Sequence, residues 1–312
     1  MIMREFALYI FHLAFFPGFI FLVASGMFFH WIDRKLLARF EGRVGPPWYQ
    51  PLADIIKLLA KEDILPAGTN DLFALLLPLT SFASTLTAGF HILGTLTGTV
   101  SSFEGEFIML IFLISLPSLL FFLGGWTTSG VYSILGGNRS LLQYFSYEVL
   151  FIMAISGTAI ASGSWSLAGI FSAQSDGLPY FIFQGAGFVL SLAGLIGKLK
   201  RSPYDIPKAK SEMVMGPLTE YSGGKLALWK LSDFLQTLSG IALIVYCYFG
   251  GLWHTKTVFG FLVFVFLMLI IQFVLSTISA VFTRLRIDQL IDLNWRVLIP
   301  LTLLHNMLIM VL

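Results

Sequence analysis

Continuous apolar runs are the feature that most limits what this chain can fold into. A bilayer core of about 30 Å needs about 20 helical residues, because a backbone that faces lipid must satisfy its own hydrogen bonds. Eight predicted spans follow the apolar runs at about 6–32, 71–94, 107–126, 147–173, 180–199, 226–250, 258–282 and 297–312. With 57% apolar and 12% charged residues, the sequence is that of an all-α integral membrane protein.

The basic residues predict which way the spans run. Of the 19 Lys and Arg residues, 17 belong to four connections, at 33–70, 127–146, 200–225 (counted with the adjoining Lys198 and Lys230) and 283–296, and only Arg4 and Lys256 lie on the other side. The positive-inside rule therefore puts these four loops in the cytoplasm and both termini outside. We expect one polytopic domain over residues 1–312, with multiple passes through the cell membrane.

The first of these loops predicts an amphipathic helix on the cytoplasmic side. After Pro51, apolar residues recur at helical spacing, and charged residues occupy the other face. Such a helix lies along the membrane surface or against a partner. Two interpretations stay open: a simple interfacial anchor, or docking of a soluble subunit on the turn from Arg39 to Trp48.

Two acids near predicted span ends are candidates for charge movement. Glu148 is expected at or just inside the start of the fourth span, and it either reaches water at headgroup level or faces the bundle interior. An interior carboxyl group suits proton relay. Asp233 lies near the start of the sixth span beside Lys230, and the two form either an interfacial salt bridge or part of a charged path.

The loop 200–225 is the most polar insert between spans, and function is expected there first. It carries three acids, Asp205, Glu212 and Glu220, among bases that include Lys208 and Lys210. Its prolines and glycines interrupt helices and permit turns.

The chain has no visible means of redox or hydrolytic chemistry by itself. Nucleotide-binding, zinc-protease and CxxC motifs are missing, and the single cysteine cannot hold an iron–sulfur cluster. We therefore expect no catalytic residue, metal site or cofactor in this chain, and no nucleic-acid partner.

Three separated motifs resemble one family, the complex I membrane subunit known as 1 or H. The first runs from Arg34-Lys35-Leu-Leu-Ala38-Arg39 to Arg43-Val-Gly45-Pro46. The second is Gly124-Gly125-Trp126 with Arg139 and Ser146-Tyr147-Glu148. The third is Arg201-Ser-Pro203-Tyr-Asp205-Ile-Pro207 with Glu212 and Glu220-Tyr221-Ser222-Gly223. They fill three cytoplasmic loops in the family's order.

The resemblance implies a subunit that joins an electron-transfer arm to ion-translocating membrane subunits. It points to Glu148, Asp205, Glu212 and Glu220 for charge sensing or proton transfer, with Lys230 and Asp233 as further members of an ion path. The residues expected to dock the soluble arm are Arg34, Lys35, Arg39, Arg43, Trp48 and Arg139.

Departures from the family pattern select a branch. Lys208 and Lys210 stand where quinone-reducing members usually have acids, and the turn at 45–51 is compact. The compact turn and Gly216-Pro217 are similar to membrane-bound, energy-converting [NiFe] hydrogenases and their ferredoxin-driven relatives, and the two lysines argue against a quinone site. The expected role is anchoring and coupling in a ferredoxin-dependent, hydrogenase-like complex that moves H⁺ or Na⁺.

This branch implies the partners. They are hydrogenase-like large and small subunits, an iron–sulfur electron-transfer subunit and antiporter-like membrane subunits, with the [NiFe] centre and the iron–sulfur clusters in those partners. The alternatives are a sulfur-reducing relative, a quinone-reducing complex, a stand-alone ion transporter and a purely structural anchor.

Overall fold

The computed structural model describes residues 11–175, 178–253 and 257–311, and within these ranges every regular element is a helix. Seven helices are long and apolar enough to cross a membrane, which confirms the all-α membrane fold. They are α2 (Phe19–Phe40) with the turn before it, α4 (Asp71–Thr97), α5 (Glu106–Thr127), α6 (Val131–Ser162), α11 (Gly223–Phe249) with the turn η2 (Gly250–Leu252), α12 (Val258–Val281), and the C-terminal run α13 (Ile287–Leu293), η3 (Asn294–Leu298) and α14 (Ile299–Val311). An eighth apolar helix, α9 (Gly185–Leu199), is shorter.

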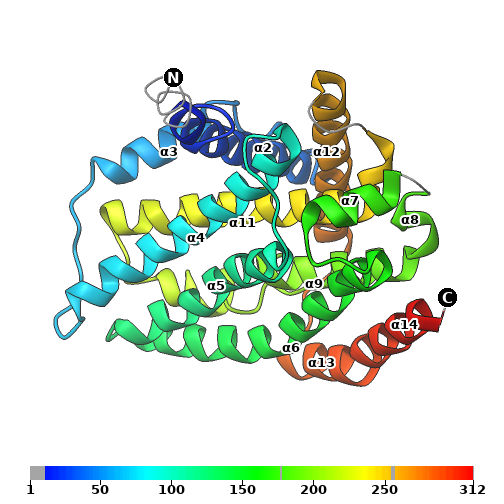
Figure 1. Cartoon of the computed structure of the whole chain (residues 1–312). Coiled ribbons are helices and arrows are strands. Elements are labelled where there is room, and N and C mark those ends of the chain that lie inside the picture. The colour runs from blue at the N-terminus through cyan, green and yellow to red at the C-terminus, as the bar shows by residue number, and fades with distance from the viewer. Residues whose placement is uncertain (1–10, 176–177, 254–256, 312) are drawn as a thin grey trace.

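Helix α11 forms the centre of the bundle (Figure 1). Every side chain from Phe234 to Tyr248 is buried, because α4, α2 and α9 surround this helix. Lipid tails are as apolar as these side chains, so close packing rather than exclusion of water holds the helices together. Gly240 shows this closeness, since a Cβ atom there would lie 2.5 Å from Cδ1 of Leu195 on α9.

Helix α6 differs most from the prediction. The segment 127–146, predicted as a loop, is mostly helical because α6 begins at Val131. Small residues on this stretch let the third loop approach: Gly136 would place a Cβ atom 2.7 Å from Cα of Gly216. The predicted span 147–173 is split instead, because α6 ends at Gly163 with φ +65° and α7 (Leu167–Ser175) follows.

Other helix boundaries also depart from the prediction. The span predicted at 180–199 is broken at Gln184, between the single turn α8 (Tyr180–Phe183) and α9. The loop predicted at 283–296 is largely helical, because α13 and the π-helical turn η3 run directly into α14.

The amphipathic helix predicted in the first loop is confirmed as α3 (Gln50–Leu59). Ile55 is buried against the bundle, whereas Leu52, Ile56 and Leu59 are exposed on the isolated chain. An exposed apolar face of this kind fits the membrane surface or a partner subunit.

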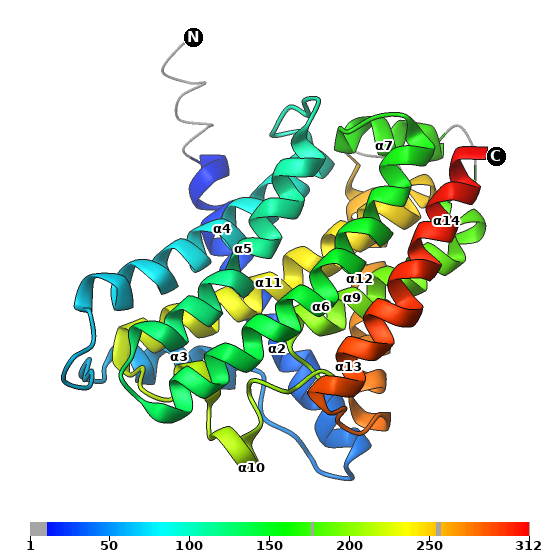
Figure 2. The same ribbon diagram turned by 90° about the horizontal axis from the view of Figure 1, so that it is seen from below.

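The third loop folds into the short helix α10 (Lys210–Met213) and the 3₁₀ turn η1 (Gly216–Leu218). The beginning of the described chain and the end of α14 lie on the opposite side of the bundle from α10 (Figure 2). The third loop and the described ends of the chain therefore lie at opposite ends of the bundle, and the side of the membrane that each end faces stays a prediction.

Candidate functional site

A cavity of about 430 Å³ opens where the third loop covers α2, α3 and α11. Its charged lining residues come from these four segments: His30, Arg34, Asp54, Lys200, Lys208, Lys230 and Asp233. Its apolar wall includes Phe121, Met215, Leu218 and Trp229. The cavity therefore brings bases, acids and an aromatic surface together at the charged end of the bundle.

Lys208 of the third loop is paired inside this cavity. Its Nζ lies 3.0 Å from Oδ1 of Asp233 and 5.5 Å from the ring centre of Phe121. The possible salt bridge between Asp233 and Lys230 is therefore not the pair that forms, because the third loop folds down over the start of α11 and brings Lys208 to the carboxylate. Lys230 lines the same cavity.

Lys200 is the second base over the same aromatic ring. It follows α9 in a left-handed conformation with φ +52°, it is buried, and its Nζ lies 4.4 Å from the ring centre of Phe121. Burial lowers the pKa of Lys200 to about 7, and the positive charge of Lys208 contributes to this lowering while Asp233 acts in the opposite direction. Lys200 therefore loses its proton more readily than an exposed lysine does.

Glu148 lies inside the bundle rather than at headgroup level. Its Oε1 is 2.9 Å from Nζ of Lys198 on α9 and also accepts a hydrogen bond from Ser115 on α5. The Lys198 ammonium donates to Ser115 as well, at 2.8 Å. Lys198 is fully buried and Glu148 is 5% exposed, so each charge depends on the other to offset the cost of leaving water.

Polar side chains extend from the cavity toward this buried ion pair. Gln236 lines the cavity, and its Nε2 donates to Oγ of Ser118 at 3.2 Å. Ser118 is one turn of α5 from Ser115, which contacts Lys198 and Glu148. Polar groups in this low-dielectric interior polarise one another, so the ion pair can respond to a change of charge in the cavity.

The other acids of the third loop lie away from Glu148. Glu212 is exposed and bridges two arginines, with Oε2 2.7 Å from Arg139 and Oε1 3.1 Å from Arg284. The hydrogen bond from Arg139 and the charge of Arg284 hold the pKa of Glu212 below its usual value. The carboxylate of Glu220 lies against Gly130, just before α6 begins.

Asp205 is half-buried within the third loop, which completes the three acids of that loop. The side chain of Lys210 lies outside what the structure describes. The third loop therefore contributes to two separate places: Lys208 enters the cavity, while Glu212 ties the loop to α6 and to the segment before α13 at the surface.

The residues predicted to dock a soluble arm fall into two groups, one partly buried and the other an exposed rim. Arg34 pairs with Asp54 of α3 at 3.0 Å. Burial alone would raise the pKa of Asp54, but hydrogen bonds from Gln50 and Arg34 outweigh it and hold that pKa below its usual value. Lys35 is half-buried, and the exposed rim consists of Arg39, Arg43 and Trp48.

Sequence reasoning missed several members of these networks. Lys198 lies at the end of an apolar run, and a lysine within an apolar run is itself a functional signal. His30 stacks on Phe234 beside the cavity, with ring centres 4.0 Å apart. Asp33 accepts hydrogen bonds from Arg201, Gln272 and Ser276, which fixes the start of the third loop against α2 and α12.

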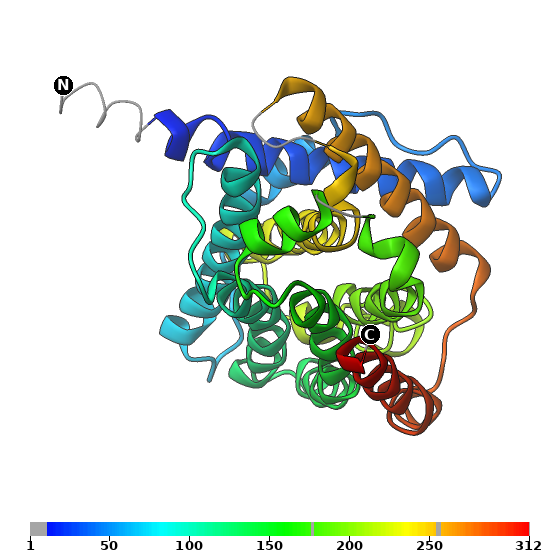
Figure 3. The same ribbon diagram turned by 45° about the vertical axis from the view of Figure 1, so that its right-hand side comes forward.

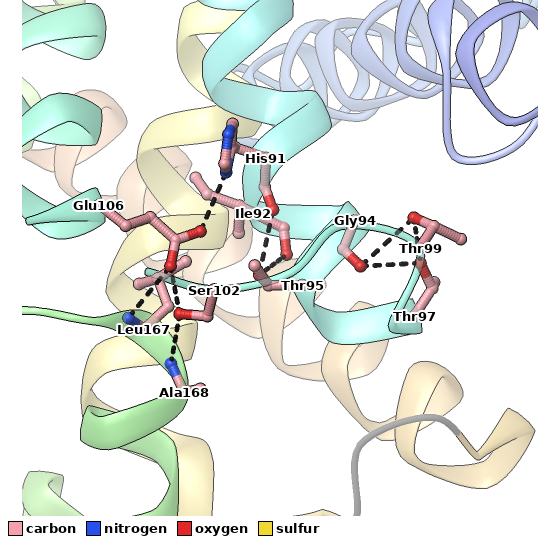
Figure 4. Close-up of polar contacts among 10 residues, drawn as sticks. All are labelled: His91, Ile92, Gly94, Thr95, Thr97, Thr99, Ser102, Glu106, Leu167 and Ala168. Carbon is pink, nitrogen blue, oxygen red and sulfur yellow. Dashed lines mark hydrogen bonds and ion pairs between the residues drawn. The ribbon is translucent and has the colours of Figure 1, made fainter. Parts of the chain in front are cut away.

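A second polar cluster lies at the other end of the bundle (Figure 4). Glu106, fully buried at the start of α5, accepts hydrogen bonds from Ser102 and from the backbone of Leu167 and lies 2.9 Å from His91. Because it joins α4, α5 and the start of α7, this carboxylate stabilises the connections on that side. No group of metal-ligating side chains occurs among the residues that the structure describes.

Comparison with known proteins agrees with these features. The family model for NADH dehydrogenase matches residues 13–310. The chain is 32% identical over 290 residues to the H subunit of NADH-quinone oxidoreductase from Dehalococcoides mccartyi (strain ATCC BAA-2266 / KCTC 15142 / 195), covering 91% of this chain and 81% of the relative.

It is 33% identical over 288 residues to the corresponding protein from Geobacillus sp. (strain WCH70), covering 88% of this chain and 85% of the relative. Together with the apolar helices, these matches identify a multi-pass protein of the cell membrane. The chain belongs to the NADH dehydrogenase family of membrane subunits, that of complex I subunit 1/H.

Proposed function

We propose that this chain is the membrane-anchor and coupling subunit of a ferredoxin-dependent, hydrogenase-like complex. It links electron transfer in a soluble arm to H⁺ or Na⁺ translocation by antiporter-like membrane subunits. The single observation that carries this proposal is the position of Lys208. A base that departs from the quinone-reducing pattern lies inside the cavity, paired with Asp233 next to Lys200.

The charges of the cavity provide a physical basis for coupling. Reduction in the arm adds negative charge near the loops, and this favours a protonated Lys200 and a weaker bond between Lys208 and Asp233. Either change alters the electric field at the buried pair of Lys198 and Glu148, toward which polar side chains extend from the cavity. Moving one charge against 100 mV requires about 2.3 kcal/mol, so the redox step must drive such a two-state change.

The proposed complex also defines the partners. The redox cofactors, a [NiFe] centre and iron–sulfur clusters, belong to the large, small and electron-transfer subunits of the arm. The exposed rim of Arg39, Arg43 and Trp48 and the paired Arg139 present a basic, aromatic surface suited to an arm subunit. The exposed apolar side of α3 is suited to the membrane surface beside it.

Quinone reduction is the second candidate, and the apolar wall of the cavity favours it. Phe121, Met215, Leu218 and Trp229 offer an apolar, partly aromatic surface next to ionisable groups, which is how small-molecule sites are commonly built. The similarity to H subunits of NADH-quinone oxidoreductase also supports it.

The identity of the co-purifying subunits separates these candidates. A large subunit with four cysteines in two CxxC pairs, and hydrogen production from reduced ferredoxin without quinone, is the expected result. Sulfide production from a large subunit without those cysteines would indicate a sulfur-reducing relative. Quinone-dependent turnover would select the second candidate, and ion transport by this chain alone in liposomes would overturn both.

A further inference from the structure

A cluster of polar side chains lies between α6, α9 and α14, away from the cavity and the buried ion pair. Helix α14, drawn in red and ending at the C-terminus, runs beside the green helices (Figure 3). On α14, Nδ2 of Asn306 donates a hydrogen bond to the carbonyl oxygen of Met153 at 2.9 Å. This bond fixes the orientation of the amide, so its Oδ1 is directed toward Gly157 of α6.

Two amide oxygens converge on Gly157. A Cβ atom placed there would lie 2.8 Å from Oδ1 of Asn306 and 3.5 Å from Oε1 of Gln184. Gln184 is 3% exposed and Asn306 is 8% exposed, and neither oxygen has a hydrogen-bond donor within the described part of the chain. Buried acceptors in native proteins are nearly always satisfied, by protein or by ordered water.

His305 of α14 extends the cluster toward Gly187, which lies about one turn along the chain from Gln184. Its Nε2 is buried without a partner among the described residues and would lie 2.6 Å from a Cβ atom on Gly187, which the hydroxyl of Tyr248 approaches to 3.2 Å. Tyr248 donates its own proton to the carbonyl oxygen of Ala154. The imidazole therefore has a hydroxyl oxygen close by and a ring nitrogen available for a further hydrogen bond.

The backbone provides an independent reason to expect a site here. Gln184 occupies the break between α8 and α9, with φ −111° and ψ 37°. Interrupted helices in membrane proteins are tolerated where the backbone is buried or lines a cavity, and they commonly accompany ion-binding sites. Here the break directs a buried amide toward two other polar side chains.

The ionisable surroundings of His305 are sparse. Glu148 on α6 is nine residues from Gly157, about 13 Å along the helix, and Lys198 on α9 is eleven residues from Gly187. The other charged groups on these elements lie well along the helices from the cluster: Arg139 on α6 is eighteen residues from Gly157, Asp233, Lys230 and Lys225 on α11 are fifteen or more residues from Tyr248, and Arg296 on η3 is nine residues from His305. The nearer ionisable groups are tyrosines and the cysteine, which are uncharged at neutral pH: Tyr144 and Tyr147 on α6, Tyr180 on α8, and Tyr246, Cys247 and Tyr248 on α11. Of these groups, only His305 has an ordinary pKa near neutral pH.

We propose that Gln184, Asn306 and His305 bind water and that His305 exchanges a proton there. The cluster is then a proton-binding site in the half of the membrane domain away from α10. This inference rests on the proposed function and deepens it. A coupling subunit that handles protons needs a proton-binding group in addition to the buried ion pair of Lys198 and Glu148.

Glycine-to-alanine variants of the intact complex test the site. Gly157→Ala and Gly187→Ala fill the space next to the amide oxygens and the imidazole, whereas Gly185→Ala is the matched control, since a Cβ atom there meets nothing within 4 Å. A map that resolves ordered water should show density about 2.7–3.2 Å from both amide oxygens in the wild type and in Gly185→Ala. The density should be lost in Gly157→Ala, and an empty site in the wild type overturns the proposal.

Proton exchange is measured separately, by NMR of ¹⁵N-histidine in the same complex. The chain has five histidines, and the signal that His305→Gln removes identifies His305. We expect it to titrate between pH 5 and pH 9 (a range about the ordinary histidine pKa), with a midpoint that Gly187→Ala shifts and Gly185→Ala does not. A signal that stays constant over this range refutes the proton site.

Gln184→Met keeps the length of the side chain and removes the oxygen, so it replaces Gly157→Ala if that variant does not assemble. Neither readout uses ferredoxin, hydrogen or an ion gradient. Failure of this inference is therefore distinguishable from failure of the proposed function.

Discussion

Lys198→Met tests whether the buried ion pair is held together as described. The substitution keeps an unbranched side chain of similar length in the same packing position but removes the ammonium group that bonds Glu148 and Ser115. Lys198 is fully buried and the Glu148 side chain is 7% exposed, so the carboxylate is left without a counter-charge. Breaking such a pair from one side costs about 3–5 kcal/mol.

Replacing both partners, as Lys198→Met with Glu148→Gln, removes both charges and is expected to cost much less than the sum of the single variants, because a neutral pair needs no compensation.

Denaturant-induced unfolding in detergent micelles measures these differences. The wild type, the two single variants and the double variant form a thermodynamic cycle, and we expect a coupling free energy above about 2 kcal/mol. A loss below about 1 kcal/mol for Lys198→Met, or a double variant equal to the sum of the singles, would refute the account of this pair.

Three further perturbations test other parts of the molecule. The pKa of Lys200 is lowered from 10.5 to about 7, so between these pH values the unfolded chain binds more protons than the folded chain. The melting temperature of the wild type should therefore rise with pH above about 7, relative to that of Lys200→Met. Parallel pH profiles of the two proteins would contradict this. Glu212→Gln should leave the fold intact and reduce co-purification of the arm at raised salt, because the exposed carboxylate orders Arg139; equal recovery at all salt concentrations would count against it. Gly136→Ala places a methyl group 2.7 Å from the backbone of the third loop. We expect the free energy of unfolding to fall by about 1–3 kcal/mol, measured by denaturant unfolding against the Gly185→Ala control. Equal stability of the two variants would show that the loop moves aside without cost.

Helix patterns were the most predictable part of this protein. Long apolar runs located the membrane helices, and the period of the apolar residues after Pro51 located α3, because both signals depend only on local sequence. Helix α6 was mispredicted over residues 131–146. Gly136 and Gly137 suggest a loop by composition, whereas in the fold they let a helix pack closely, Gly136 against the third loop and Gly137 against α5.

The site was predictable in part. Its acids stand out in an apolar sequence, and the family motifs drew attention to Glu148 and Lys208. Their partners did not stand out, because Lys198 is 50 residues from Glu148 along the chain and Asp233 is 25 residues from Lys208. Contacts between residues so far apart in sequence depend on how the helices cross, and a single sequence does not reveal the crossing geometry.

The central claim is that this chain couples ferredoxin oxidation to ion movement without a quinone. The direct measurement uses the purified complex in sealed, quinone-free liposomes supplied with reduced ferredoxin, with hydrogen and the transmembrane ion gradient recorded together. We predict hydrogen production with a gradient in the wild type, and a lost or much reduced gradient in Glu148→Gln. A requirement for quinone, or a full gradient in Glu148→Gln, would contradict the account.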